Sequence, residues 1–264
     1  MVLSRTSSSL GSLIKDYRNK RGMTFEKLDQ LTDVDKGNIC RIESGRIKRP
    51  NLDNILKIGS ILKIPYEEMM EPYIEVEERS DILFTILHEL IRSNNNINSN
   101  MITKLAKKIL NSPTEESLDL VKNLYNSTAN IEEPSTKLIL YKLIVRHSRA
   151  HGIMPYVAKS LLQAYLVERD DFTKLRTTYG SGKGTIEYED FLTSEERGLM
   201  YYKLFVHSYN LCLFEDSIKM GEKALNEEIS DISLRRHYKP RIKKRYLSTL
   251  IVSKYQEQNI NIQK

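Results

Sequence analysis

The sequence predicts an all-α fold in which a bundle of five short helices is followed by a longer series of antiparallel helices. Glycine and proline are scarce, at 11 and 7 of 264 residues. Apolar residues recur at helical spacing along most of the chain, and no alternating strand pattern stands out. Because 40% of the residues are hydrophobic, the chain can bury a real core, and its length suits one large domain or two ordinary ones.

The first three short helices have recognisable starts and stops. Apolar residues repeat at helical spacing from Leu10 onward, and Gly22 is expected to end the first helix. Thr24 and Asp35 are good N-caps for the second and third helices, because their side-chain oxygens can accept hydrogen bonds from the first turn. Gly45 is expected to stop the third helix.

Two more helices complete the bundle. Isoleucine and leucine mark a fourth helix over residues 55–62, and Pro65 precedes a short fifth one over residues 66–70. Pro72 is expected to end this part of the chain. The predicted domains are therefore residues 1–72 and residues 73–264.

The second domain is expected to be helical throughout. A helix is predicted over residues 79–92, and the polar run at residues 93–100 is the best candidate for a hinge. The segment Gly180–Gly184 is expected to be a loop. The other predicted helices cover residues 101–111, 115–127, 134–150, 155–169, 172–179, 194–212, 214–227 and 237–257.

Four sequence motifs coincide between residues 10 and 70. They are KRGMT at the start of the second helix, Ile-x-x-Ile-Glu-x-Gly in the third, Arg-Pro after it, and a closing Ile-Pro-x-x-Glu. Together they resemble the phage-repressor-like, Xre-type helix-turn-helix family. The resemblance implies a domain that binds double-stranded DNA, with its third helix in the major groove. It also implies a sequence-specific transcription regulator and not an enzyme.

The third helix has an apolar side and a polar side. Ile39 and Ile42 are expected to face the core. The opposite side is expected to read bases, because lysine and arginine can donate to guanine, asparagine suits an adenine edge or a phosphate, and glycine lets the groove wall approach. The predicted base-reading residues are Lys36, Gly37, Asn38 and Arg41.

The resemblance also implies an ion pair between Arg18 and Glu43 that joins the first helix to the third; the alternative is two separate surface charges. Two residues depart from the family pattern. Phe25 replaces a polar residue that contacts phosphate, and Asp29 stands where alanine is usual, so that it either weakens docking or pairs with a nearby basic residue. Contacts to phosphate or to the minor groove are expected from Thr24, Arg46, Lys48 and Arg49.

Residues 198–227 resemble a tetratricopeptide repeat, a pair of antiparallel helices that pack closely through small residues at fixed places. In this stretch the small residues are Ser217, Gly221 and Ala224. A weaker copy is indicated at residues 156–179, and residues 236–255 fit the first helix of another repeat; the alternative is a generic helical bundle.

An Xre-type domain joined to such repeats resembles the peptide-pheromone receptors of Gram-positive bacteria and their phages (the Rap, NprR, PlcR and PrgX group). The resemblance implies a homodimer that binds a short extended peptide in a groove lined by the repeats. The candidate peptide contacts are Tyr202, Tyr209, Asn210, Lys159, Gln163 and Tyr165. Two alternatives stay open: a ligand-independent dimeric repressor, and a repeat protein that inhibits a partner such as a response regulator.

Composition restricts the remaining possibilities. The net charge is +6, which is compatible with nucleic acid, and the seven basic residues from Arg235 to Arg245 form either a solvated helix face or a further DNA contact. Cys40 and Cys212 are expected to be reduced core thiols, which favours a cytoplasmic location. No signal peptide, membrane span, catalytic constellation, metal site or cofactor motif is expected.

Overall fold

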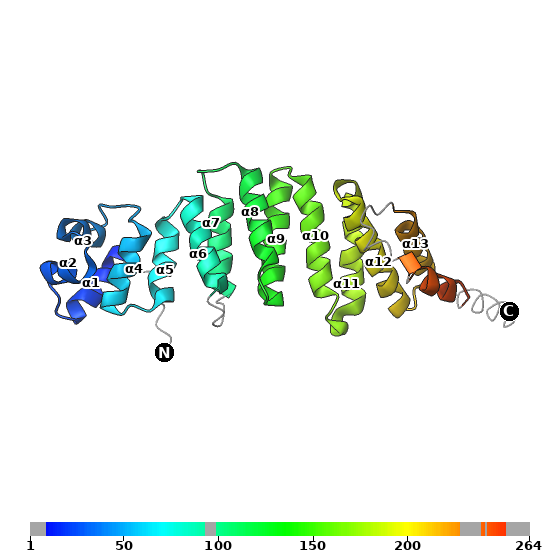
Figure 1. The fold of residues 1–264 in the computed structure, drawn as a ribbon, viewed down its shortest axis with the longest axis horizontal. Coiled ribbons are helices and arrows are strands. Elements are labelled where there is room, and N and C mark those ends of the chain that lie inside the picture. Colours follow the sequence, from blue (N-terminus) through cyan, green and yellow to red (C-terminus); the bar gives the residue numbers. More distant parts are fainter. Residues whose placement is uncertain (1–8, 93–98, 228–238, 241, 252–264) are drawn as a thin grey trace. The chain divides into compact units, whose positions relative to one another are not determined.

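The computed structural model describes residues 9–92, 99–227, 239–240 and 242–251, and this part of the chain is helical, without a strand (Figure 1). The all-α prediction is therefore confirmed. The chain divides into two compact units, residues 1–120 and 121–264. No described helix combines the length and the apolar character needed to cross a membrane.

The first unit begins with the five predicted helices. Their bounds are α1 (Leu10–Lys20), α2 (Phe25–Thr32), α3 (Lys36–Glu43), α4 (Leu52–Leu62) and α5 (Tyr66–Val76). Their apolar faces meet in one core, in which Ile14, Leu28, Ile39 and Ile55 are fully buried. Burial of the apolar face of each short helix, rather than helix propensity, stabilises the bundle.

The predicted helix ends are confirmed in detail. The Thr24 hydroxyl accepts a hydrogen bond from the backbone N–H of Lys27 at 3.2 Å, and the Asp35 carboxylate accepts one from the N–H of Asn38 at 3.1 Å. Gly22 and Gly45 follow α1 and α3 with φ of 60° and 70°, a conformation that glycine adopts without steric cost.

The fifth helix is longer than predicted. We expected it to end near residue 70 with Pro72 closing the domain, but α5 continues through Pro72 to Val76. A proline in a helix forgoes one backbone hydrogen bond. Tyr73 and Ile74 are both fully buried, and this packing of the last turn outweighs the lost bond.

Two further helices, α6 (Ser80–Arg92) and α7 (Ser99–Leu110), pack together, and α7 also packs on α5. The helix predicted over residues 79–92 is confirmed. Helix α8 (Ser117–Ala129) begins in the first unit and continues in the second. Compact packing thus extends to residue 120, while the division of roles at residue 72 stays a prediction.

The second unit consists of helical hairpins. Its elements are α9 (Pro134–Ala150), α10 (Met154–Glu168), η1 (Phe172–Lys174), α11 (Leu175–Gly184), η2 (Thr185–Phe191), α12 (Ser194–Asn210) and α13 (Phe214–Asn226). The closest neighbours are α9 with α10 and α12 with α13. Tyr165, Leu204 and Phe205 lie in a shared core. A Cβ at Gly221 would stand 3.2 Å from the Phe205 ring, so the predicted small residue does allow close packing of α12 and α13.

The prediction of a loop over Gly180–Gly184 was wrong. This segment forms the last turns of α11. Three glycines give this segment a low helix propensity. Tyr179 and Gly182 are nevertheless buried, and a Cβ at Gly182 would lie 2.6 Å from the Tyr165 ring. Tertiary packing therefore decides the conformation here.

The prediction that both cysteines are core thiols was also wrong, because Cys40 and Cys212 are exposed. Cys40 lies on the outer side of α3. Cys212 follows the end of α12 at Asn210 and has a φ of 59°, in the turn that leads into α13. Of the basic cluster from Arg235 to Arg245, residues 235–238 and 241 lie outside the described residues; Lys243, Lys244 and Arg245 are exposed on a helix.

Candidate nucleic-acid interface

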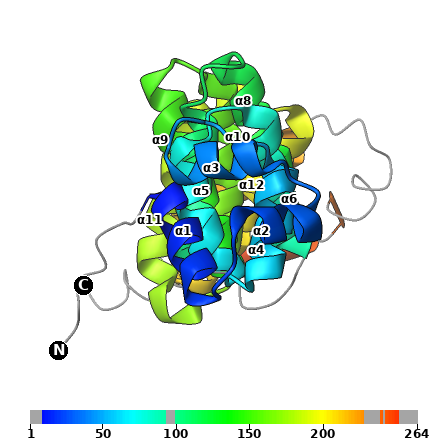
Figure 2. The same cartoon turned by 90° about the vertical axis from the view of Figure 1, so that its left-hand side faces the viewer.

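Helix α3 packs on α1 and α2 (Figure 2). It has one buried side and one side exposed to solvent. Ile39 and Ile42 are buried, as predicted. The four predicted base-reading residues lie together on the other side, where Asn38 is half-buried and the other three are exposed: Lys36, Gly37 and Arg41. A helix with this arrangement can enter a major groove without losing its packing against the bundle.

Arg41 is held along the outer side of α3. Its guanidinium donates to Oδ1 of Asn38 at 2.6 Å, and its Nε donates to the carbonyl oxygen of Gly37 at 3.3 Å. Both contacts are one turn away on the same helix. They restrict the rotamers of a long side chain, which lowers the entropy that Arg41 loses when it meets a base.

Two carboxylates organise the start of α3. Asp35 caps the helix, and Oδ2 of Asp29 accepts a hydrogen bond from the backbone N–H of Lys36 at 3.1 Å. Asp29, a departure from the family pattern, therefore joins α2 to α3. Gly37 is explained by the same cap, because a Cβ there would stand 2.9 Å from Oδ1 of Asp35. The Nζ of Lys36 lies 3.7 Å from the Glu26 carboxylate, in a pair exposed to solvent.

The predicted pair of Arg18 and Glu43 is present and nearly buried. Arg18 donates from Nε and NH2 to the two oxygens of Glu43 at 2.7 and 2.9 Å, and from NH1 to the carbonyl oxygen of Met23 at 2.9 Å. Its guanidinium also lies 4.2 Å from the centre of the Phe25 ring. Hydrogen bonding to Glu43, which outweighs the opposing effect of burial, raises the pKa of Arg18. Phe25, the second departure, thus covers this pair.

Gly11 is a position that supports α3 and that the sequence reasoning missed. A Cβ at this residue would lie 2.5 Å from the carbonyl oxygen of Ile42 and 2.6 Å from that of Glu43. Only glycine allows the start of α1 to approach the end of α3 so closely. The available signal was a glycine inside an amphipathic helix pattern, where alanine would be the better helix former.

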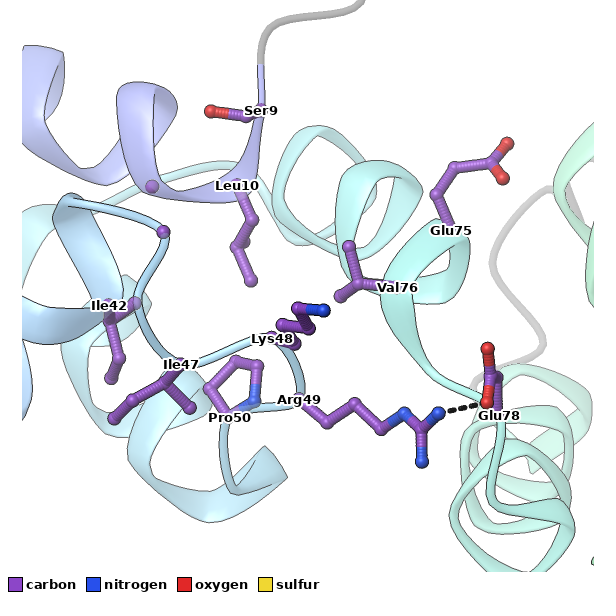
Figure 3. Close-up of a pocket in the computed structure, with 12 residues that line it drawn as sticks. Ser9, Leu10, Ile42, Ile47, Lys48, Arg49, Pro50, Glu75, Val76 and Glu78 are labelled. Atoms are coloured by element: carbon purple, nitrogen blue, oxygen red, sulfur yellow. Dashed lines mark hydrogen bonds and ion pairs between the residues drawn. The ribbon is translucent and has the colours of Figure 1, made fainter.

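The segment after α3 carries the predicted phosphate contacts. Arg46 and Ile47 both donate their backbone N–H to the carbonyl oxygen of Arg41, at 2.9 and 3.2 Å, so the loop starts from a fixed helix end. The side chains of Arg46, Lys48 and Arg49 are exposed, as is Thr24 at the start of α2. Lys48 and Arg49 border a cleft of about 450 Å³ between this loop, the start of α1 and the end of α5 (Figure 3).

The candidate ligand contacts lie in the second unit, on α10 and α12. Lys159 of α10 lies 3.8 Å from Glu196 of α12, and the Tyr165 ring of α10 stacks on His207 of α12. These side-chain contacts join α10 to α12 within the second unit. Gln163, Tyr202 and Tyr209 are half-buried and Asn210 is exposed.

One predicted ligand contact is placed elsewhere. Tyr165 is buried in the core, and its hydroxyl lies 3.2 Å from Nδ1 of His207. Sequence reasoning missed a neighbouring aromatic group, in which the Tyr125 ring centre is 5.6 Å from Tyr141 and 5.5 Å from Tyr156. Within the described residues, no group of histidine, cysteine and carboxylate side chains is arranged to hold a metal ion.

The capped helices, the two-sided α3 and the buried arginine–glutamate pair define a helix-turn-helix domain, and residues 14–69 match the helix-turn-helix family. Two regulators of Bacillus subtilis (strain 168) resemble this region. The HTH-type transcriptional repressor RghR is 34% identical over 70 residues, and the uncharacterized HTH-type transcriptional regulator RghRB is 30% identical over 63 residues. These matches cover 26% and 24% of this chain, and the chain spans only 52% and 45% of these relatives.

The chain was also compared with solved structures. The crystal structure of Bacillus thuringiensis PlcR in complex with the peptide PapR7 and DNA aligns over 97% of this chain and 98% of that chain. The sequence identity is 16% and the TM-score is 0.34.

Proposed function

We propose that this protein is a sequence-specific DNA-binding transcription regulator that acts in the cytoplasm as a homodimer. The outer side of α3 carries this proposal, because it offers Lys36 and Arg41 on a helix that is fixed from behind by the pair of Arg18 and Glu43. Arginine and lysine donate to guanine O6 and N7 in the major groove, and Asn38 suits an adenine edge. Two such domains in a dimer read half-sites about one helical turn apart.

The loop after α3 contributes binding free energy that does not depend on the DNA sequence. Arg46, Lys48 and Arg49 are exposed cations on a loop whose start is fixed. Contacts from such residues to phosphate release counterions, so they set the affinity and the register of the domain while base contacts set the site. We include Thr24, an exposed residue at the start of α2, as a further hydroxyl contact to phosphate.

Genome-wide footprinting of the wild type beside Lys36→Ala/Arg41→Ala tests this function. We expect the double variant to lose the specific sites while keeping its fold, as judged by circular dichroism. A matched control, Lys122→Ala/Arg176→Ala, removes the same charges from exposed positions of the second unit and is expected to keep the sites. Occupancy of the same sites at the same affinity by the first double variant would contradict the assignment.

We further propose that a short extended peptide, bound by the second unit, controls DNA binding. We take the candidate surface to consist of Lys159 and Gln163 of α10 and Tyr202, Tyr209 and Asn210 of α12. The contact between Lys159 and Glu196 joins the two helices, which supports this choice. The backbone amides of an extended peptide need donors and acceptors, which glutamine and asparagine side chains supply together. Tyr165 supports the core and is not part of this surface.

Calorimetric titration with short hydrophobic peptides, including those encoded next to this gene, tests the ligand. Gln163→Ala/Asn210→Ala is expected to weaken binding at least tenfold, about 1.4 kcal/mol, if both amides pair with the peptide backbone. Asn123→Ala/Asn226→Ala, which removes two exposed amides from α8 and α13, is the control. Specific DNA binding that no peptide alters would favour a ligand-independent repressor, and a protein that binds a response regulator but no DNA would favour the partner-inhibiting alternative.

A further inference from the structure

One of the predicted phosphate contacts is already engaged within the first unit. The guanidinium of Arg49, in the loop after α3, forms a hydrogen-bonded ion pair with the carboxylate of Glu78, which follows α5 (Figure 3). Arg46 and Lys48 form no ion pair with any described residue. Glu78 therefore acts on one cation of the loop and not on the others.

Glu78 is held in place from two directions. The preceding residue, Glu77, is fully buried, and its carboxylate accepts hydrogen bonds from the backbone N–H of Glu78 at 3.0 Å and of Arg79 at 2.9 Å. The Tyr73 hydroxyl lies 3.0 Å from this carboxylate and 3.2 Å from the carbonyl oxygen of Pro50, the residue after Arg49. One network thus fixes the backbone on both sides of the ion pair.

The segment before α8 secures the same turn from the other side. The Ser112 hydroxyl donates to the carbonyl oxygen of Glu78 at 2.5 Å, and the backbone N–H of Ser80 donates to the Thr114 hydroxyl at 3.1 Å. A carboxylate on so restrained a turn loses little conformational entropy when it pairs with Arg49. The side chains of Arg49 and Glu78 are still 47% and 43% exposed, so the pair can open to an incoming anion.

We propose that Glu78 is an internal competitor for Arg49 that lowers the affinity of the helix-turn-helix domain for the DNA backbone. This inference rests on the proposed DNA binding. The Glu78 carboxylate engages NH2 of Arg49, so it must give up that nitrogen before a phosphate can bind the guanidinium in a bidentate manner. Glu78 is thus a positioning residue, which sets how much of the charge on the loop is available to DNA.

The size of the effect follows from the exposure of the pair. Exposed ion pairs contribute little, and the measured range corresponds to a change in binding of about 1.5-fold to 5-fold. The effect is also expected to fall with salt, because solvent ions screen an exposed pair.

Fluorescence anisotropy with a short labelled duplex of random sequence measures the affinity for the DNA backbone, in a salt series from about 50 to 200 mM. The full chain is compared as wild type, Glu78→Gln, Arg49→Gln and the double variant. Glu75→Gln is the matched control: it removes the same charge at the border of the same cleft, but Glu75 pairs with Lys104 at 2.7 Å. Thermal unfolding of each variant verifies that the fold is kept.

We expect Glu78→Gln to tighten binding within the range above at low salt, and to have a much smaller effect, no larger than that of Glu75→Gln, once Arg49 is glutamine. Glu75→Gln is expected to have a smaller effect that is the same in both backgrounds. Equal tightening by Glu78→Gln in both backgrounds, or no tightening while the wild type binds, would overturn the inference. A wild type that binds no duplex would instead overturn the proposed function and the inference with it.

Discussion

Arg18 and Glu43 join α1 to the end of α3 through two hydrogen bonds, at 2.7 and 2.9 Å, between side chains that are 11% and 4% exposed. The backbone of Gly11 touches the same end of α3. The position of α3 is therefore set by a charged contact and a steric contact, and each can be tested separately.

The charged contact is expected to be costly to break. Glu43→Ala leaves the Arg18 guanidinium nearly buried and without its carboxylate, and loss of one partner of a buried pair costs about 3 to 5 kcal/mol. Urea unfolding of the full chain measures this loss. Arg18→Met/Glu43→Leu, which removes both charges, should cost less than either single change; a single variant that loses under about 1 kcal/mol would contradict a buried pair.

The steric contact predicts opposite effects of one substitution at two helical glycines. Gly11→Ala places a methyl group 2.5 Å from a carbonyl oxygen, and we expect a loss of about 1 to 3 kcal/mol from overpacking. Gly180→Ala, in α11, meets no atom within 4 Å and should stabilise by about 1 kcal/mol through helix propensity. Thermal unfolding compares the two, and destabilisation by Gly180→Ala would also argue against the helix found there.

The second unit is expected to lose stability in mild acid through His207. Burial lowers the pKa of His207 below its ordinary value of 6.5. A hydrogen bond that the ring donates to the Leu175 backbone opposes this shift, and the charge of Arg169 lowers the pKa further. Below pH 6.5 the unfolded chain then binds a proton that the folded chain does not. The contribution of His207 to stability is therefore complete above pH 6.5, and it falls as the pH drops toward the lower pKa of His207 in the folded chain.

The midpoint of thermal unfolding, measured between about pH 7.5 and 5.5, tests this prediction. His207→Gln should show a weaker pH dependence than the wild type, whatever its absolute midpoint. His88→Gln, at an exposed position of the first unit, is the control. Parallel curves for the wild type and His207→Gln would show that His207 is not responsible.

The loop cations predict a separable effect on DNA binding. Arg46→Gln and Lys48→Gln should weaken binding to all sequences alike. Each should reduce the slope of log affinity against log salt by about 0.9, the value for one phosphate contact. Anisotropy titrations on specific and random duplexes measure both quantities, and a loss confined to one sequence would instead make the residue a base contact.

Local signals in the sequence were sufficient for the first four helices. Thr24 and Asp35 are cap residues in the sequence and caps in the structure, and Gly22 and Gly45 end their helices with positive φ. The same kind of signal was misleading at Pro72 and at Gly180–Gly184. There the burial of Tyr73 and of Tyr179 comes from partners distant in sequence, which local propensity does not include.

The candidate site was predictable to a similar degree. The two sides of α3 follow from helical periodicity, and the pair of Arg18 and Glu43 follows from the family resemblance. The pairing of Arg49 with Glu78 could not be predicted, because Glu78 is 29 residues away in the sequence and lies beyond the expected end of the domain. The helical pattern does not distinguish Tyr165 from a residue that lines a groove. Only its packing with residues of α12 shows that it belongs to the core.

The most direct test of the account uses the two exposed cysteines, Cys40 on α3 and Cys212 in the second unit. A photocrosslinker is attached to Cys40 in a Cys212→Ser variant, and to Cys212 in a Cys40→Ser variant, with the protein bound to a duplex from a footprinted site. We predict cross-links to bases in the major groove from Cys40 and none from Cys212. Bound protein whose Cys40 label gives no adduct with DNA would contradict the claim that α3 reads the sequence.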